Sequence, residues 1–535
     1  MILNMKKIKA MKLNFKVVLY LVQFSFVILN VSFSNAQSKP GNAANNRPNI
    51  LLIYADDLGY GDLSCYGATK IKTPNIDKVA SQGLLFTNAH ATSATCTPSR
   101  YSMITGEYAW RKKGTGIAPG NASLLIDTAK LTLPAILKNA AYNTAIIGKW
   151  HLGLGTGDGP QWNGEIRPGP MELGFNSSFI IPATVDRVPC VYVEGHRVLN
   201  LDPNDPIEVS YKEPIGNWPT GLDHPELLKM KPTHGHNQTI VNGISRIGYM
   251  TGGKSALWTD EDIANVLVQR SVDFLEKNRN NPFFLFVSTH DIHVPRAPHA
   301  NFAGKSGLGA RGDVILQFDW TVGEIMKTLD GLGLANNTMV IISSDNGPVV
   351  NDGYQDGSVE NLNGHKPAGV LRGGKYSAFD GGTRVPLIIH WPKVVSKGTS
   401  DAAVSQVDFL ASFAALTGQQ YNAKDAPDSK NTLSVFLGKS KKDRDQIIEQ
   451  SLNNTLSIIE GTWKYIEPGK GPAKSAETGI ELGNIPEPQL YDLSKDKGEK
   501  NNLAKKYPEK VKVFATKMAA IKSAAGIKQQ EIKLQ

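Results

Sequence analysis

The sequence predicts an α/β protein in which a large mixed sheet is sandwiched between helices, followed by a smaller C-terminal α+β domain with an antiparallel sheet and a helix. Short apolar runs alternate with helical patterns as far as about residue 391, which is typical of an α/β sandwich. Of the 535 residues, 41% are hydrophobic and 20% are charged. This globular composition excludes a disordered protein, a collagen and a coiled coil. Beyond Trp391-Pro392 the chain becomes more polar and its apolar runs become shorter.

The N-terminal leader has the three-part layout of a secretory signal peptide. Five lysines precede the apolar runs Val17–Val22 and Phe24–Val31, and the small residues Ser34–Ala36 follow. A membrane anchor needs about 20 unbroken apolar residues, whereas polar residues interrupt this run. We expect residues 1–36 to be removed by cleavage after Ala36. The protein would then have no membrane span and be periplasmic or secreted.

Charge and cysteine content narrow the class of protein further. The formal net charge of +9 falls to +4 once the five leader lysines are removed, and no Lys/Arg-rich run follows. This balance gives no indication of a nucleic-acid partner, although it suits an anionic substrate. Three cysteines do not make a disulfide framework, so a buried core must stabilise the chain.

The first elements of the predicted α/β domain are a buried strand and a helix. Ile50–Tyr54 is apolar and is followed by two aspartates, and Pro74–Gln82 predicts a helix with Thr73 as its N-cap and proline at its first position. Thr132-Leu133-Pro134 opens a second helix in the same way, and Ala145–Ile147 is the strand after it.

Two long helices come next, each followed by a strand. The first spans about Asp260–Lys277 with its apolar residues on one side, and the strand Phe283–Val287 follows it. The second spans about Asp313–Asp330, ends at a glycine, and precedes the strand Met339–Ile342. Pro386–Ile389 is the last strong strand of the large sheet.

The C-terminal part of the chain has a different pattern of apolar and polar residues. Residues about 395–445 are polar. Leu456–Ile459, Trp463–Ile466 and Leu490–Leu493 predict short strands, and a helix follows at about Glu509–Ala524. We place the domain boundary near residue 445, which gives an N-terminal domain of residues 37–445 and a C-terminal subdomain of residues 446–535.

Oxygen donors follow two of the predicted strands. Asp56 and Asp57 come after the first strand, and Asp345 and Asn346 come after the strand at Met339–Ile342. Open α/β sheets place their active sites at such strand ends. Oxygen ligands without His or Cys favour a hard cation, calcium or magnesium, over zinc. Because adjacent unpaired carboxylates repel each other, the two pairs together indicate a cation site.

Cys96 differs from the other two cysteines. In Cys96-Thr97-Pro98-Ser99-Arg100, Thr97 is a potential cap and Pro98 a potential first helical residue, which places Cys96 at a helix N-terminus where an anion is favoured. Arg100, one turn further on, can supply a fixed positive charge. Cys65 and Cys190 have no such surroundings and are expected to pack as small apolar residues.

Further cationic residues lie in glycine-rich segments. Lys149 and His151 follow the strand at Ala145–Ile147, His293 follows the strand at Phe283–Val287, and Lys375 lies in LRGGK. The glycines allow the backbone to approach a ligand closely. Lysine, arginine and histidine around a hard cation indicate a pocket for a tetrahedral oxyanion ester, either a sulfate or a phosphate.

These motifs together resemble the formylglycine-dependent (type I) sulfatases of the alkaline phosphatase superfamily, and in particular exported bacterial carbohydrate sulfatases. The resemblance runs from about residue 48 to residue 510 and implies an alkaline-phosphatase-like fold. The segments that carry it are DDLGYGDLSCYG, CTPSR, GKWHLG, SSDNG, LRGGKYSAFDGGTRVP and LYDLSKDKGEKNNLA.

The resemblance implies the nucleophile and the metal. Cys96 would be oxidised to formylglycine by a maturation enzyme, and a hydroxyl of the hydrated aldehyde would attack sulfur in line and release the sugar alcohol. One Ca²⁺, rather than Mg²⁺, would be held by Asp56, Asp57, Asp345 and Asn346. Asp345 would also take the proton of the nucleophile.

The resemblance also implies roles for the cationic residues. Arg100 and Lys149 would steady the hydrate and the sulfate charge, and His151 would act as the base that breaks the sulfated intermediate. His293 and Lys375 would protonate or stabilise the leaving oxygen. A sulfate ester resists attack because its oxygens are negative, so this concentration of positive charge suits it.

The substrate would be a sulfated glycan, with galactose or N-acetylgalactosamine sulfates favoured by the similarity of FIIPATVDRVPCVYVE to bacterial carbohydrate sulfatases. The insert between Ile147 and Asp260 is expected to build the sugar subsite. His290 is either a substrate contact or a residue behind the site. The candidates within the insert are Asp186, Arg187, Glu194, His196 and Arg197.

Two other functions remain open at this point. A phosphodiesterase or phosphonate monoester hydrolase of the same superfamily can carry C-x-P-S-R, although zinc phosphatases supply His ligands and His365 has no recognisable ligand spacing. An inactive glycan-binding protein would result if Cys96 were never converted.

Overall fold

The computed structural model describes residues 47–442 and 444–524. The predicted signal peptide, residues 1–36, and its cleavage point after Ala36 lie outside the described residues. Within the described ranges, no helix has both the length and the apolar character needed to cross a membrane.

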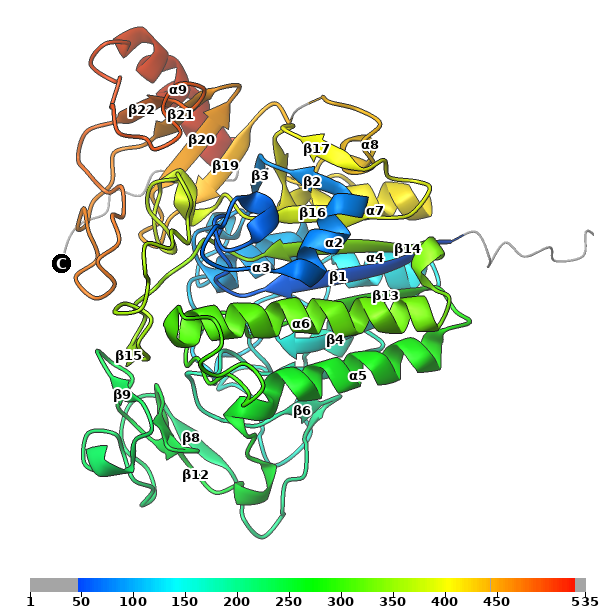
Figure 1. Cartoon of the computed structure of the whole chain (residues 1–535), viewed down its shortest axis with the longest axis vertical. Coiled ribbons are helices and arrows are strands. Elements are labelled where there is room, and N and C mark those ends of the chain that lie inside the picture. The colour runs from blue at the N-terminus through cyan, green and yellow to red at the C-terminus, as the bar shows by residue number, and fades with distance from the viewer. Residues whose placement is uncertain (1–46, 443, 525–535) are drawn as a thin grey trace, which may run out of the picture. The chain divides into compact units, whose positions relative to one another are not determined.

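A ten-stranded mixed sheet forms the centre of the protein, as the sequence predicted (Figure 1). The strand order is β17-β2-β16-β14-β1-β13-β4-β5-β6-β7. The strands from β14 to β5 run parallel, β16 and β2 run antiparallel to their inner neighbours, β17 is parallel to β2, and β6 and β7 continue the other edge as antiparallel strands. Their bounds are β1 Asn49–Ala55, β2 Leu84–Phe86, β4 Asn143–Lys149, β5 Ser177–Ile181, β6 Val193–Glu194, β7 Arg197–Val198, β13 Phe283–Ser288, β14 Thr338–Ser344, β16 Leu387–His390 and β17 Gly398–Ser400.

The central strands are apolar because helices cover both faces of the sheet. Every residue of β1 is buried. Ile50 and Leu52 join the apolar cluster on one face, whereas Leu51 and Ile53 join the cluster on the other. A parallel strand that is buried on both faces has a continuous apolar sequence. This apolar run is the reason that β1 could be predicted from the sequence.

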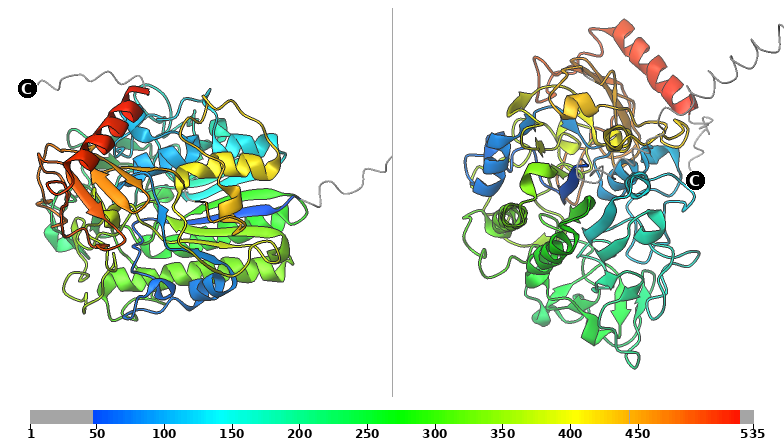
Figure 2. Two further views of the ribbon diagram at one scale, coloured as in Figure 1. Left: turned by 90° about the horizontal axis from the view of Figure 1, so that it is seen from above. Right: turned by 90° about the vertical axis from the view of Figure 1, so that its right-hand side faces the viewer.

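Helices lie against both faces. α2, α5 and α6 pack against the face that carries Leu51, and α3, α4 and α7 pack against the face that carries Ile50. Figure 2 (left) shows the sheet edge-on, with a long green helix on one side and the yellow helix α7 on the other. The bounds are α2 Pro74–Gln82, α3 Cys96–Thr105, α4 Leu133–Asn139, α5 Ile263–Asn278, α6 Gly309–Gly331 and α7 Phe409–Thr417.

Helix starts differ from the prediction in local detail. α2 has the predicted bounds and Thr73 is its N-cap residue, but the Thr73 side chain makes no cap hydrogen bond; its hydroxyl accepts from the Ser64 N–H (3.1 Å) instead. α6 begins at Gly309, four residues before the predicted Asp313. The Asp313 carboxylate accepts from the N–H of Gly304 (2.8 Å) and thus anchors the preceding loop rather than starting the helix.

The prediction that residues 395–445 are simply polar was wrong. This segment contains α7, FLASFAALT, whose residues from Phe409 to Ala414 are all buried. It also contains the short helix α8 (Leu433–Phe436), whose Phe436 is fully buried. Composition averaged over such a long segment hides a nine-residue apolar helix.

The C-terminal α+β part is also confirmed, with one strand more than predicted. Its antiparallel sheet has the order β19-β20-β21-β22. Phe514 of α9 stacks on Tyr465 with ring centroids 6.0 Å apart. The bounds are β19 Ile447–Gln450, β20 Leu456–Glu460, β21 Trp463–Ile466, β22 Gln489–Asp492 and α9 Pro508–Ala524. No observation tests the boundary at residue 445, which stays a prediction.

Short two-stranded pairs complete the structure. Three of them lie in the loops beyond the large sheet: β8 with β12, β9 with β15 and β10 with β11; β3 pairs with β18. Their bounds are β3 Ala89–His90, β8 Glu208–Ser210, β9 Lys231–Pro232, β10 Ile240–Val241, β11 Ile244–Ser245, β12 Tyr249–Thr251, β15 Tyr354–Gln355 and β18 Val404–Ser405.

A buried charge cluster connects the C-terminal sheet to the large domain. The Lys464 ammonium of β21 lies 3.0 Å from Glu449, 3.6 Å from Glu499 and 3.8 Å from Asp380. His90 pairs with the other oxygen of Glu449 at 2.8 Å. The spacing of His90, Asp380 and Glu449 would suit a metal ion. The lysine ammonium, however, already supplies the positive charge among these carboxylates.

Replacing Lys464 with methionine is expected to lower the free energy of unfolding by about 3–5 kcal/mol, because the change leaves buried carboxylates without their cation. Urea unfolding of the purified protein measures this loss. Lys495→Met is the matched control, since Lys495 is exposed on the same subdomain and its loss should cost less than about 1 kcal/mol. Equal stabilities of the two variants would contradict the role given to Lys464.

Candidate active site

The carboxyl ends of four parallel strands meet at one edge of the large sheet. In the register of this sheet, Ala55 of β1 pairs with Ser344 of β14, Tyr54 pairs with Ser288 of β13, and Ser288 pairs with Gly148 of β4. The residues that follow these strands therefore lie side by side. The sequence-predicted residues brought together in this way are Asp56, Asp57, Lys149, His151, His293, Asp345 and Asn346.

The four predicted oxygen ligands form a fully buried cluster. Asn346 Nδ2 donates to Asp57 Oδ1 (2.7 Å), and the Asp57 N–H donates to Asp345 Oδ1 (3.3 Å). Burial, and next the charge of Asp345, raise the pKa of Asp56 well above its usual range. Asp56 Oδ1 and Asn346 Oδ1 have no hydrogen-bond partner among the described residues. Buried oxygens without partners are rare, so this donor set fits a hard cation.

Three cationic side chains surround the oxygen cluster. Lys149 Nζ lies 2.5 Å from Asp56 Oδ2, and Arg100 Nε donates to Asp345 Oδ2 at 2.9 Å. Lys375 Nζ donates to Asp57 Oδ2 at 2.8 Å. All three cationic side chains are buried, so their positive charges act in a low-dielectric environment where they affect a bound anion strongly.

Cys96 is the first residue of α3, with Thr95 at the N-cap position. The sequence placed the helix start at Pro98, two residues too late. Proline is tolerated within the first turn because its missing N–H would have no helical partner there. The prediction that Cys96 lies at a helix N-terminus is confirmed. The side chain is 2% exposed, and burial raises the pKa of the thiol.

His151 contacts the cysteine directly. Cys96 Sγ lies 3.2 Å from His151 Nδ1, and His151 Nε2 lies 2.9 Å from the Ala118 carbonyl oxygen. A carbonyl oxygen only accepts, so Nε2 must carry the proton and Nδ1 is left as an acceptor. Burial and the charge of Lys149 hold the pKa of His151 well below its usual range. A neutral histidine therefore faces the side chain of residue 96.

A cavity of about 310 Å³ opens above Cys96. This volume lies at the lower end of the range for small-molecule sites, ~300–1,000 Å³. Asp186 and Arg187, predicted from the insert, line it together with His293 and Lys375. The other lining residues are Ile117, His234, Gly235, His236, Ile247, Asp352, Tyr376 and Glu477.

The remaining predicted sugar-binding residues do not line this cavity. His196 pairs with Glu172 (3.0 Å) and Glu194 pairs with Arg270 (3.0 Å). Arg197 is exposed at the edge of the sheet. His290 is buried and does not line the cavity, and burial lowers its pKa to about 4.

Sequence reasoning missed two groups of cavity residues. Asp352 accepts from Lys375 Nζ (2.9 Å) and from the Tyr376 hydroxyl (3.0 Å). His236 Nε2 donates to Asp186 Oδ2 at 3.1 Å. The glycine after Asp352 was a sequence signal for a close approach of the backbone to another group. In the structure a Cβ on Gly353 would lie 2.1 Å from the His236 ring. Glycine at this position therefore marks a close approach, but its partner is far away in sequence.

Asp352→Asn is expected to lower kcat/KM by about 10–100-fold, the usual loss when a group that orients a site residue is removed. The carboxylate holds the Lys375 ammonium in place, and a neutral amide holds it less firmly. Steady-state kinetics on a sulfate ester measure the effect. Asp352→Glu, which keeps the charge, should recover part of the activity. An Asp352→Asn enzyme within twofold of the wild type would contradict this role.

The cavity, the buried oxygen-donor cluster with its surrounding cationic side chains, and the cysteine at a helix N-terminus together fit a site for anionic esters. The Sulfatase family model matches residues 48–419. The chain belongs to the sulfatase family and is a sulfuric ester hydrolase, as its motifs predicted.

Individual relatives agree with the family assignment. The chain is 56% identical over 490 residues to an N-acetylgalactosamine-6-O-sulfatase of Bacteroides thetaiotaomicron, covering 91% of this chain and 96% of that protein. It is 30% identical over 488 residues to human arylsulfatase A, covering 86% and 84%. A solved structure described under the metabolism of multiple glycosaminoglycans by Bacteroides thetaiotaomicron matches with a TM-score of 0.89 and 57% identity, covering 89% of this chain and all of that one.

Proposed function

We propose that this protein removes the 6-O-sulfate of N-acetylgalactosamine in a sulfated glycan. The observation that carries the proposal is that Cys96, at the N-terminus of α3, lies in the same cavity as Lys375, His293 and the insert residues Asp186 and Arg187. The relative of 56% identity is named for this substrate. The sequence had favoured galactose or N-acetylgalactosamine sulfates, and the proposal narrows that choice.

Residue 96 acts as the nucleophile. Formylglycine made from Cys96 by a maturation enzyme would supply a hydrated aldehyde with two hydroxyls. One would attack sulfur as the sugar alcohol leaves, and deprotonation of the other would expel sulfate by C–O cleavage and restore the aldehyde. His151 Nδ1, 3.2 Å from Cys96 Sγ, is placed to accept a proton from this side chain. Its neutral state at physiological pH suits a base.

Asp56, Asp57, Asp345 and Asn346 would hold one Ca²⁺, which supplies positive charge for the sulfate oxygens. The partnerless oxygens of Asp56 and Asn346 support this assignment. Arg100 holds Asp345 in place through its Nε (2.9 Å). Lys149 and Arg100 add fixed positive charge at the point where negative charge develops.

His293 and Lys375 protonate or stabilise the sugar oxygen that leaves the sulfate. His293 Nδ1 donates to the Val294 carbonyl (2.7 Å), so Nε2 is the nitrogen available on the cavity side, 3.9 Å from Asp57. Lys375 and Asp352 lie on the same cavity wall. Because Nδ1 carries the proton and burial holds the pKa of His293 well below its usual range, Nε2 is an acceptor that can orient the leaving group. The Lys375 ammonium is then the group that supplies the proton, which converts the departing sugar alkoxide into an alcohol.

Asp186, Arg187 and His236 bind the sugar ring. Arg187 and Asp186 form an ion pair (2.9 Å), and this pair together with His236 holds the pKa of Asp186 well below its usual range despite burial. A charged, preorganised pair presents fixed donors and acceptors to sugar hydroxyls and to the N-acetyl group. We further propose that the protein is exported to the periplasm or the cell exterior, where sulfated glycans occur.

Sulfate release from a panel of monosulfated sugars tests this function. The panel contains N-acetylgalactosamine 6-sulfate, its 4-sulfate isomer, galactose 6-sulfate, N-acetylglucosamine 6-sulfate and the 6-phosphate of N-acetylgalactosamine. The protein is co-expressed with a maturation enzyme, and the mass of the Cys96 peptide verifies conversion. Preferred release from N-acetylgalactosamine 6-sulfate supports the proposal. Preferred turnover of the phosphate, or binding without turnover by the converted protein, contradicts it.

A further inference from the structure

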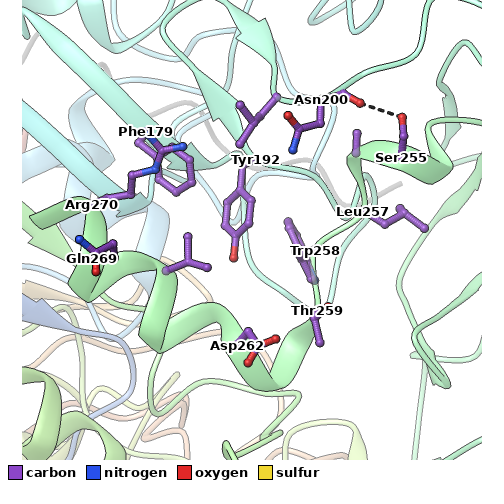
Figure 3. A pocket seen from close by; sticks show the side chains of 13 residues that line it. Phe179, Tyr192, Asn200, Ser255, Leu257, Trp258, Thr259, Asp262, Gln269 and Arg270 are labelled. Atoms are coloured by element: carbon purple, nitrogen blue, oxygen red, sulfur yellow. Dashed lines mark hydrogen bonds between the residues drawn. The ribbon is translucent and has the colours of Figure 1, made fainter. Parts of the chain in front are cut away.

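A second cavity, of about 420 Å³, lies between β5 and the start of α5, but the rings that line it already cover one another (Figure 3). The Arg270 guanidinium lies over the Phe179 ring, 4.4 Å from its centroid. The Phe179 and Tyr192 rings stack with centroids 4.8 Å apart, and the Trp258 ring lies 5.8 Å from that of Tyr192. Because these contacts occupy the ring faces, sugar recognition belongs with the cavity above Cys96.

His236 stands between two hydrogen-bond acceptors in the wall of the cavity above Cys96. Its Nε2 lies 3.1 Å from Asp186 Oδ2, and its Nδ1 lies 2.8 Å from the His234 carbonyl oxygen. A neutral imidazole carries one N–H, so the lone pair of its other nitrogen would face an oxygen here. Both nitrogens donate only when the ring is an imidazolium. The geometry therefore favours a positively charged His236.

Asp186 is a carboxylate in this arrangement. Arg187 Nη1 donates to Asp186 Oδ1 at 2.9 Å and to Oδ2 at 3.0 Å. Burial raises the pKa of Asp186, but the charge of Arg187 and next the hydrogen bond from His236 outweigh it and hold that pKa well below its usual range. The Asp186 carboxylate thus lies between two cations, which fix its orientation in the cavity wall.

Other titratable groups also face the His236 ring. The His234 ring lies 6.0 Å from it, and the Tyr354 ring lies 4.8 Å from it. Burial raises the pKa of the Tyr354 hydroxyl well above its usual range, so this group is uncharged. Burial lowers the pKa of His236 itself, but Asp186, the His234 carbonyl and the charge of Asp352 raise it more, so this pKa lies above the usual value of 6.5.

We propose that His236 is a positioning residue that works in its protonated form: the imidazolium holds the Asp186 carboxylate for the sugar, and sugar affinity falls when His236 loses its proton. Below the pKa of His236 the pair is complete. As the pH rises through that pKa, one ring nitrogen turns a lone pair toward an oxygen, and Asp186 loses one of its two cationic partners. The inference rests on the proposed function for the role of Asp186, but the protonation of His236 is measured without a substrate.

Two neighbouring groups of the cavity keep one charge state between about pH 6 and about pH 9. Burial holds the pKa of His293 well below its usual range, so this ring stays neutral. Burial lowers the pKa of Lys375, but the charges of Asp352 and Asp57 outweigh it and hold that pKa well above its usual range, so the ammonium stays charged. A loss of sugar affinity at alkaline pH is therefore not expected from these two groups.

Nitrogen NMR of histidine-labelled protein measures the protonation directly, and the signals missing from His236→Gln identify the ring. At about pH 6 both ring nitrogens should carry a proton. In Asp186→Asn the titration midpoint of His236 should fall by about one pH unit or more, because an opposite charge beside the ring is lost. A ring with one proton at that pH, or an unchanged midpoint in Asp186→Asn, would overturn the inference.

Steady-state kinetics on N-acetylgalactosamine 6-sulfate separate positioning from a general loss of structure. The wild-type KM should rise about 10-fold between about pH 6 and about pH 9, with a smaller change in kcat. His236→Gln can still donate a hydrogen bond but carries no charge, so its KM should be high throughout and show no alkaline rise. His234→Gln keeps the carbonyl that His236 contacts and, as the matched control, should keep the rise.

A His236→Gln enzyme with the wild-type KM profile would also contradict the inference. If the converted protein instead turns over a different sulfated sugar of the panel, the proposed function fails. The same pH profile measured on that sugar then decides the role of His236.

Discussion

The Cys96→Ala protein is expected to lose sulfate release by a factor on the order of 10⁴ or more, the loss found when a nucleophile is removed from a cooperating set of catalytic residues. The side chain of residue 96 lies at the N-terminus of α3, contacts His151 and lines the cavity that opens above it. Alanine keeps the helix but supplies no nucleophile. Initial rates on N-acetylgalactosamine 6-sulfate measure the change.

Cys190→Ala is the matched control for this prediction. Cys190 is also buried, but it does not line the cavity that opens above Cys96. Its replacement should lower stability slightly and leave kcat/KM within about twofold, because only packing and a weak Sγ hydrogen bond to the Arg187 carbonyl (3.9 Å) are lost. Equal losses in the two variants, or an active Cys96→Ala protein, would contradict the assignment of residue 96 as the nucleophile.

Removal of bound metal by EGTA and dialysis is expected to lower turnover by at least about 10²-fold, the loss seen when an electrostatic group at a reacting oxyanion is removed. The unfolding temperature should fall at the same time, because a ligand that binds the folded state stabilises it. Loss of the ion removes positive charge from the sulfate oxygens, which lowers turnover, and it removes the ligand shared by Asp56, Asp57 and Asp345, which lowers the unfolding temperature.

Readdition identifies the ion. Calcium should restore both turnover and unfolding temperature, whereas magnesium, which binds fewer protein oxygens, should restore neither in full. Asp57→Asn removes one anionic ligand, so more calcium should be required for half-maximal activity. Unchanged turnover and unfolding temperature after complete chelation would reject the metal site.

Local sequence patterns were sufficient for much of the fold. The apolar run of β1 and the Thr-Leu-Pro start of α4 identified these elements, because buried parallel strands and helix N-termini have strong local signatures. α7 was missed because its apolar residues sit within a polar stretch. The start of α6 was misplaced because Asp313 bonds to the preceding loop, which local spacing does not reveal.

The candidate site was predictable where its residues stand in dense motifs. Asp56, Cys96, Lys149 and Lys375 each lie in such a motif and meet at the carboxyl edge of the sheet. Asp352 and His236 were not identified, since each stands alone in a loop, and Tyr376 was passed over although it follows Lys375 within LRGGKYSAFDGGTRVP. His196 was proposed from the same insert as Asp186, yet it pairs with Glu172 outside the cavity.

The sequence by itself determined the fold class, the sulfatase family and the residues with reactive chemistry, because strand apolarity, helix starts and short motifs are local properties of the chain. Only the tertiary structure decided which insert residues face Cys96, that Asp352 holds Lys375, and that Tyr192 and Trp258 share a second cavity. These contacts join residues far apart in sequence. Their formation depends on how loops pack above the sheet, which no local pattern encodes.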